Sequence, residues 1–161
     1  NESGAFDVLE GKDAGAQLVY AGYDDKSELV GLAVEAQGMG YQDVIGLIYG
    51  YSFAEDAIIG IQVLESKETP GLGDKIEVDP EFLANFERLD VSLRDDNSEL
   101  ANPIVPVKHG EKSSPWEVDG ITGATISSVA IARILNESAQ YWVPRIRSHL
   151  RDFQGDVEGG E

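Results

Sequence analysis

The residues best suited to carry out chemistry form a run of small side chains, DGITGATISS, in the C-terminal part of the sequence. An apolar pattern of helical spacing follows this run, so we expect it to lead into a helix N-terminus. Such an end attracts anions, because the first helical amides lack partners and the helix dipole is positive there. Gly123 and Ala124 would let a phosphate group approach the backbone near the amides of Ser127 and Ser128. The alternative is that the hydroxyl of Thr125 or Ser127 simply caps the helix.

A second run of small residues, ETPGLGDK, begins at Glu68. Pro70 and Gly71 favour a tight turn, because proline presets its φ angle and glycine accepts a positive φ. The run follows an apolar segment, Ile58–Glu65, of the kind expected for a strand. By itself it fits an ordinary turn without a ligand.

The elements that must position these two runs begin with three apolar-Gly-apolar triplets. They lie at Val30–Leu32, Ile45–Leu47 and Ile59–Ile61, spaced by roughly 15 residues, and the alternation around the third has the period of two that a half-buried strand shows. We expect successive strands of a sheet, with turns at Gly38–Gly40 and Ala54–Asp56.

Two helices are expected in addition. Apolar residues recur at helical spacing over Ile126–Trp142, which predicts a helix with one broad apolar stripe. Pro144 should end or kink this helix, because proline has no amide hydrogen to donate. Asp79 followed by Pro80 predicts the capped start of a second, short helix.

Further strands are expected at Val91–Arg94 and Ile104–Lys108, the latter at an edge because Pro103 and Pro106 lack amide donors. The whole pattern predicts an α+β fold: a largely antiparallel sheet packed by helices, forming a single domain, with the two small-residue runs converging at one edge.

Composition limits the class of function. The chain has 161 residues with 42% hydrophobic side chains, enough for one folded domain, and a formal net charge of -18 that would repel nucleic acid. Its lack of cysteine excludes disulfides, thiolate zinc sites and cysteine-ligated iron–sulfur clusters. His109 and His149 lie far apart in the sequence, so we expect surface histidines and no metal site.

Three segments are expected along the chain. We divide the chain into a lead-in over residues 1–25, a cofactor-binding domain over residues 26–153 and an acidic tail over residues 154–161. The sequence starts at Asn1 and has no apolar run of about 18 residues, so we expect any signal or anchor segment to lie upstream of it.

The run DGITGATISS is similar to the flavinylation motif of the FMN-binding domain family, in which the threonine after Gly-Ala carries FMN as a phosphoester. This resemblance implies that FMN is the cofactor and that Thr125 is its attachment point. It also implies a separate flavin transferase that supplies the FMN and recognises Asp119 and Gly120. The residue types suit the chemistry, because neighbouring backbone donors stabilise a phosphodiester.

The run beginning at Glu68 resembles the ETPGLG loop that the same family places against the isoalloxazine ring. The resemblance implies that backbone amides and Leu72 press on the flat ring and that Lys75 offsets charge on a reduced flavin. The two motifs stand in family order, and the resemblance extends from about Tyr41 to Trp142. The cofactor-binding residues that it implies are Glu68, Thr69, Pro70, Gly71, Leu72, Gly73, Lys75, Thr122, Gly123, Ala124, Thr125, Ser127 and Ser128.

Members of this family include the G subunit of the Rnf ferredoxin:NAD oxidoreductase complex. The resemblance implies an electron-carrying flavoprotein subunit of an ion-translocating membrane complex, with the other subunits as partners and no acid–base catalysis of its own. It also implies the extracytoplasmic (periplasmic) face of the inner membrane and an anchoring N-terminal helix. Three alternatives remain open: a subunit of a sodium-pumping NADH:quinone oxidoreductase, an FMN-binding sensory or regulatory module, and a structural subunit without flavin.

Overall fold

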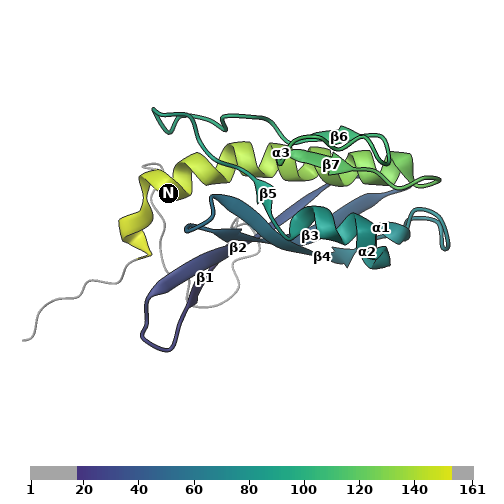
Figure 1. The fold of residues 1–161 in the computed structure, drawn as a ribbon. Coiled ribbons are helices and arrows are strands. Elements are labelled where there is room, and N and C mark those ends of the chain that lie inside the picture. Colours follow the sequence, from purple (N-terminus) through teal and green to yellow (C-terminus); the bar gives the residue numbers. More distant parts are fainter. Residues whose placement is uncertain (1–17, 154–161) are drawn as a thin grey trace, which may run out of the picture.

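Five antiparallel strands form the main sheet, in the order β1-β2-β3-β4-β5. The computed structural model describes residues 18–153, so the expected acidic tail and most of the lead-in lie outside the described residues. The strands are β1 (Val19–Tyr23), β2 (Leu29–Met39), β3 (Val44–Ser52), β4 (Ala57–Glu65) and β5 (Leu89–Asp90). A single long helix, α3 (Thr125–Ser148), crosses one face of this sheet (Figure 1). The predicted α+β class is confirmed.

The three apolar-Gly-apolar triplets lie in β2, β3 and β4, which pair as predicted. The turn at Ala54–Asp56 is also confirmed, whereas the turn expected at Gly38–Gly40 begins later. Gly38 and Met39 continue β2, and the reversal is closed by the amide of Gly40, which donates to the carbonyl of Asp43 at 2.8 Å. The strand is longer than expected because β3 supplies pairing partners for its last residues.

Other boundaries also differ from the sequence prediction. Val19–Tyr23 pairs with β2, so the sheet begins ahead of residue 26, the expected start of the domain. The strand expected at Val91–Arg94 is wrong: β5 precedes it, and only Leu93 forms an isolated bridge. The segment expected as an edge strand contains β6 (Val105–Val107), which pairs in parallel with β7 (Glu117–Asp119) in a separate two-stranded sheet.

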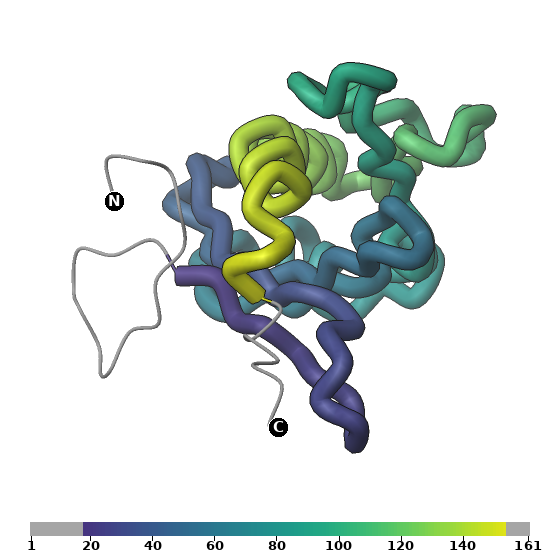
Figure 2. Tube along the Cα trace, turned by 90° about the vertical axis from the view of Figure 1, so that its left-hand side faces the viewer, coloured from purple at the N-terminus to yellow at the C-terminus, as the bar shows by residue number. Residues whose placement is uncertain are grey.

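Figure 2 shows α3 nearly end-on, lying over one face of the sheet. The buried apolar residues of α3 belong to the same core cluster as those of the strands. Along β2 and β3, buried and more exposed residues alternate, so one face of each strand enters the core. The buried Tyr49 of β3 hydrogen-bonds Ser138 of α3 at 2.9 Å between the two hydroxyl oxygens. Burial raises the pKa of Tyr49, which keeps this phenol neutral.

Pro144 does not end α3, which continues to Ser148. Val143, Pro144 and Ile146 are all buried, so packing on the core offsets the backbone hydrogen bond that proline removes. Beyond the proline, Arg147 donates to the carbonyl of Phe53 at 3.0 Å and pairs with Asp56. These contacts fix the C-terminal part of the helix to the β3–β4 turn.

Three short helical segments connect β4 to β5: α1 (Lys75–Val78), α2 (Pro80–Leu83) and the 3-10 helix η1 (Ala84–Phe86). A second 3-10 helix, η2 (Leu150–Asp152), follows α3. The predicted capped start is confirmed, because the side chain of Asp79 accepts a hydrogen bond from the amide of Phe82 at 2.9 Å.

Replacing Asp79 with alanine is expected to lower the free energy of unfolding by about 1 kcal/mol, the usual cost of losing a helix cap. Urea denaturation followed by circular dichroism measures this loss. The matched control is Glu81→Ala, an exposed carboxylate two residues later that caps nothing. Equal stability of the two variants would contradict the assignment of the cap.

Candidate functional site

The N-terminus of α3 carries no side-chain cap. Its cap residue is Ala124, and the two buried serines of the first turn bond elsewhere. The hydroxyl of Ser128 donates to the carbonyl of Ala124 at 2.8 Å and accepts from the amide of Ile121 at 3.1 Å. The hydroxyl of Ser127 donates to the carboxylate of Glu68. The capping alternative for Thr125 and Ser127 is therefore wrong, and the positive end of the helix dipole is left for another acceptor.

Thr125 is the first residue of α3, and its side chain is exposed. Among residues 18–153, no group hydrogen-bonds to its hydroxyl. The preceding Gly123 has a φ angle of 83°, a conformation that glycine adopts without strain. Thr122 and Gly123 are exposed as well, so the loop presents a free hydroxyl beside uncapped helical amides.

The carboxylate of Glu68 joins the two small-residue runs. Glu68 is only 5% exposed, although its side chain is polar. One carboxylate oxygen accepts the amides of Tyr41 and Gln42 at 3.0 and 3.1 Å, and the other accepts the hydroxyl of Ser127. The expected convergence of the two runs at one edge of the sheet is confirmed, and we name this set of contacts the Glu68 bracket.

Two glycines let the backbone pack against the Glu68 bracket. A Cβ atom at Gly73 would lie 2.8 Å from the Cβ of Glu68 and 2.9 Å from the hydroxyl oxygen of Ser127. A Cβ atom at Gly40 would lie 2.6 Å from a carboxylate oxygen of Glu68. Real side chains essentially never come this close, so a larger residue at either position would displace its neighbours, the side chain of Glu68 among them. Gly73 belongs to the second small-residue run, and its close packing against Glu68 and Ser127 explains why glycine stands at this position.

The rest of the second run turns outward. Its turn covers Pro70 to Asp74, as predicted, and Gly71 has a φ angle of 75°. Pro70, Gly71 and Leu72 are exposed, whereas Thr69 is half-buried and accepts a hydrogen bond from the side chain of Gln42 at 2.7 Å. The exposed apolar side chain of Leu72 is free to contact a ligand or a partner.

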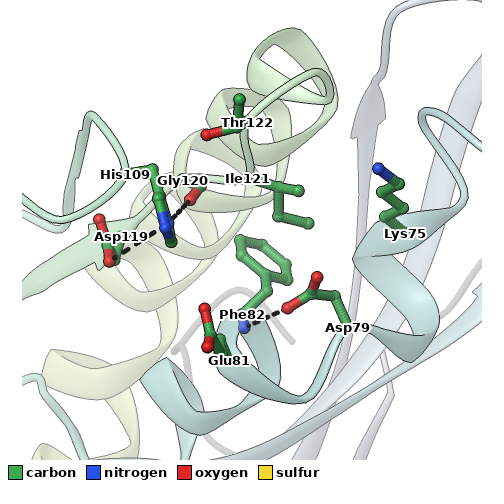
Figure 3. A pocket seen from close by; sticks show the side chains of 9 residues that line it. All are labelled: Lys75, Asp79, Glu81, Phe82, His109, Asp119, Gly120, Ile121 and Thr122. Carbon is green, nitrogen blue, oxygen red and sulfur yellow. Dashed lines mark hydrogen bonds and ion pairs between the residues drawn. The ribbon is translucent and has the colours of Figure 1, made fainter.

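A cavity of about 180 Å³ lies between the α1–α2 segment and the loop that precedes α3 (Figure 3). Phe82 and Ile121 supply its apolar surface, and both are buried. Lys75 and Thr122, both predicted site residues, line it too. The full lining is Lys75, Asp79, Glu81, Phe82, His109, Asp119, Gly120, Ile121 and Thr122.

His109 is exposed, as the sequence predicts, and it also lines this cavity. Its Nδ1 atom lies 3.2 Å from the carbonyl oxygen of Gly120 and 3.8 Å from a carboxylate oxygen of Asp119. The parallel pairing of Val107 with Asp119 brings His109 to this position. No local signal in the sequence predicts such a pairing, and for that reason sequence reasoning misses this histidine.

A buried asparagine holds the start of the first run in place. Asn85 is 4% exposed, and its amide group uses both of its ends. Its oxygen accepts from the backbone amide of Asp119 at 2.9 Å and from Lys112 at 3.1 Å, and its nitrogen donates to the carbonyl of Asp119 at 3.0 Å. Burial lowers the pKa of Lys112, partly offset by the carboxylates of Asp119 and Glu117. The side chain of Asn85 thus holds the backbone of Asp119 in place.

Residues 40–140 match the FMN-binding domain family. The match covers most of the chain and contains both small-residue runs, the Glu68 bracket and the cavity. The chain belongs to the FMN-binding domain family.

Its relatives are named as subunits of larger assemblies. The chain is 37% identical over 124 residues to the G subunit of the ion-translocating oxidoreductase complex of Methanosarcina acetivorans, covering 77% of this chain and 57% of the relative. It is 28% identical over 128 residues to the protein of the same name from Escherichia coli K12, covering 79% and 57%. The chain therefore spans a little over half the length of these relatives.

Solved structures share the fold. The crystal structure of Shewanella oneidensis NqrC superposes with a TM-score of 0.64 at 25% identity, covering 84% of this chain and 60% of that one. Among the described residues, no helix combines the length and the apolar character that crossing a membrane requires.

Proposed function

We propose that this protein is an electron-transfer flavoprotein subunit that carries FMN as a phosphoester on Thr125, within an Rnf-type ferredoxin:NAD oxidoreductase complex. The observation that carries the proposal is the exposed hydroxyl of Thr125, which has no hydrogen-bond partner among residues 18–153, at the uncapped N-terminus of α3. A covalently held phosphate would face the free amides and the positive end of the helix dipole.

The residues around Thr125 fit this cofactor. Thr122 and Gly123 leave the approach to the helix open, and the methyl side chain of Ala124 is too small to cover the helical amides. The bound flavin would supply reversible uptake and release of electrons, which no side chain of this chain provides. The role of the protein is to hold, orient and shield that group. We assign no acid–base residue and no stand-alone catalytic activity.

Each small-residue run has a separate task in this proposal. The first run supplies the acceptor hydroxyl and the anion-binding amides, and Asp119 and Gly120 are the positions that a flavin transferase would recognise. The second run supplies Leu72 and Lys75 as candidate contacts of the ring. An indirect role is proposed for Glu68, Gly73 and Ser127, because these three residues contact one another within the Glu68 bracket. They hold the two runs together and do not contact the FMN themselves.

The wider assembly is part of the proposal too. The relatives named as G subunits support other subunits of an ion-translocating complex as partners. We propose attachment to the membrane by an N-terminal helix upstream of the described residues and a position on the extracytoplasmic (periplasmic) face. The similarity to NqrC favours the C subunit of a sodium-pumping NADH:quinone oxidoreductase as the second candidate. Identification of the subunits that co-purify with the full-length protein would distinguish the two.

The test of the FMN linkage is co-production of the domain with a flavin transferase in an exporting host, followed by intact mass and peptide mapping. The expected result is a mass gain of one FMN less one water, located on the peptide that contains Thr125. Persistent absence of this gain in the presence of active transferase would overturn the proposal. Such a result would favour a structural or sensory role without covalent flavin.

A further inference from the structure

The cavity between the α1–α2 segment and the loop that precedes α3 combines an apolar surface with a polar rim. Phe82 and Ile121 provide the apolar part, and Lys75 and His109 provide nitrogen atoms. Figure 3 shows Lys75 and His109 on different walls, with Ile121 and Phe82 between them. Pockets that join an apolar surface to convergent polar groups are common sites for small organic ligands and cofactors.

The carboxylates of the rim do not form a metal site. Asp79, Glu81 and Asp119 all line the cavity, but within residues 18–153 no group of three acidic or histidine side chains is close enough to hold a metal ion. One oxygen of Asp79 is already used by the amide of Phe82, and Asp119 accepts the amide of Gly110 at 2.8 Å. The remaining carboxylate oxygens are acceptors for an N–H donor of a ligand.

One ring nitrogen of His109 is available to bind a ligand. Because a carbonyl oxygen can only accept, the contact of Nδ1 with the carbonyl of Gly120 at 3.2 Å places the ring proton on Nδ1. The second nitrogen, Nε2, has no hydrogen-bond partner among the described residues. Lys75 likewise makes no ion pair within the described part of the chain, although acidic residues lie near it in sequence.

The cavity lies within reach of Thr125. Thr122 lines it and precedes Thr125 by three residues, which span at most about 10 Å of extended chain. At about 180 Å³ it is too small for a whole FMN group, but it accommodates one end of a ring system.

We propose that this cavity receives the pyrimidine edge of the flavin ring, with His109 as a flavin-contacting residue; this inference rests on the proposed attachment of FMN to Thr125. The pyrimidine edge alternates two carbonyl oxygens with one N–H group. Lys75 donates to a carbonyl oxygen, and the Nε2 atom of His109, with the ring proton on Nδ1, accepts from the N–H group. The apolar body of the ring then extends past Ile121 toward Leu72.

The test uses the two histidines of the chain as reporters. His109 lines the cavity, whereas His149 follows the last residue of α3. Along the helix axis, His149 lies about 36 Å from Thr125. Ring ¹H–¹³C NMR spectra are recorded for the protein with FMN on Thr125, verified by intact mass, and for Thr125→Ala from the same host. His109→Gln assigns the two signals.

The expected result is a displacement of the His109 signals by several line widths on FMN attachment, with the His149 signals unchanged. An unchanged His109 signal in mass-verified FMN protein would overturn the cavity proposal and leave the FMN linkage standing. Equal displacement of both histidines would also overturn it, because the change would then be global. Absence of FMN on Thr125 would defeat the proposed function and the cavity proposal with it.

Discussion

Thr125→Ala is expected to lose all covalently bound FMN while keeping the stability of the parent protein. The variant removes the acceptor oxygen, and no phosphoester can form without it. The side chain is exposed and has no hydrogen-bond partner within the described part of the chain, so its removal costs no buried contact there. Intact mass after co-production with a flavin transferase measures the loss, and urea denaturation measures stability.

Two control variants distinguish loss of the acceptor from damage to the loop. Thr122→Ala removes a neighbouring exposed hydroxyl but keeps the acceptor oxygen, so the FMN that it carries is still expected on Thr125. Thr125→Ser keeps a hydroxyl and is expected to retain part of the loading. FMN on the Thr125→Ala protein would show that another residue is the acceptor, and peptide mapping would identify it.

Glu68→Ala is expected to lower the free energy of unfolding by about 3 kcal/mol, because one buried and two partly buried hydrogen-bond donors lose their acceptor. These donors are the amides of Tyr41 and Gln42 and the hydroxyl of Ser127. Urea denaturation of the FMN-free protein measures the loss. Glu68→Gln should recover most of the stability, since the hydroxyl of Ser127 can accept from the new amide group.

A double-mutant cycle with Ser127→Ala shows whether the effect arises in the Glu68 bracket. The two losses are expected to be non-additive by about 1 kcal/mol, as for residues in direct contact. Glu65→Ala, an exposed carboxylate three residues earlier, is the matched control and should change stability by less than about 0.5 kcal/mol. Additive effects of Glu68→Ala and Ser127→Ala would mean that the two side chains do not interact.

The parts of the fold that the sequence predicts are those set by local patterns. Alternation and glycine spacing identify β2, β3 and β4, and the apolar stripe identifies α3, because burial of one face imposes these periods. The cap at Asp79 is predictable for the same reason, since donor and acceptor lie three residues apart. Family resemblance adds Thr125, which local physics alone would have left as a candidate cap.

The remaining parts depend on contacts between distant segments. Pro144 stays inside α3 because the residues around it are buried, which no helix rule predicts. The parallel pairing of β6 with β7, and with it the place of His109, is set by the connection between the two strands and by the hydrogen bonds of Asn85. The carboxylate of Glu68 was expected to contact the cofactor, yet the structure uses it to join Ser127 to the Gly40 turn.

The long helix is fastened to the sheet at both ends, by Ser127 to Glu68 near its start and by Arg147 to Phe53 and Asp56 near its finish. Flexing of α3 against the sheet would break one of these anchor points. The attachment point at Thr125 therefore has a fixed position within the domain, and its distance to an electron donor or acceptor changes only when the whole domain moves. We expect the carrier to travel as a rigid body, with its range set by what connects it to the rest of the assembly.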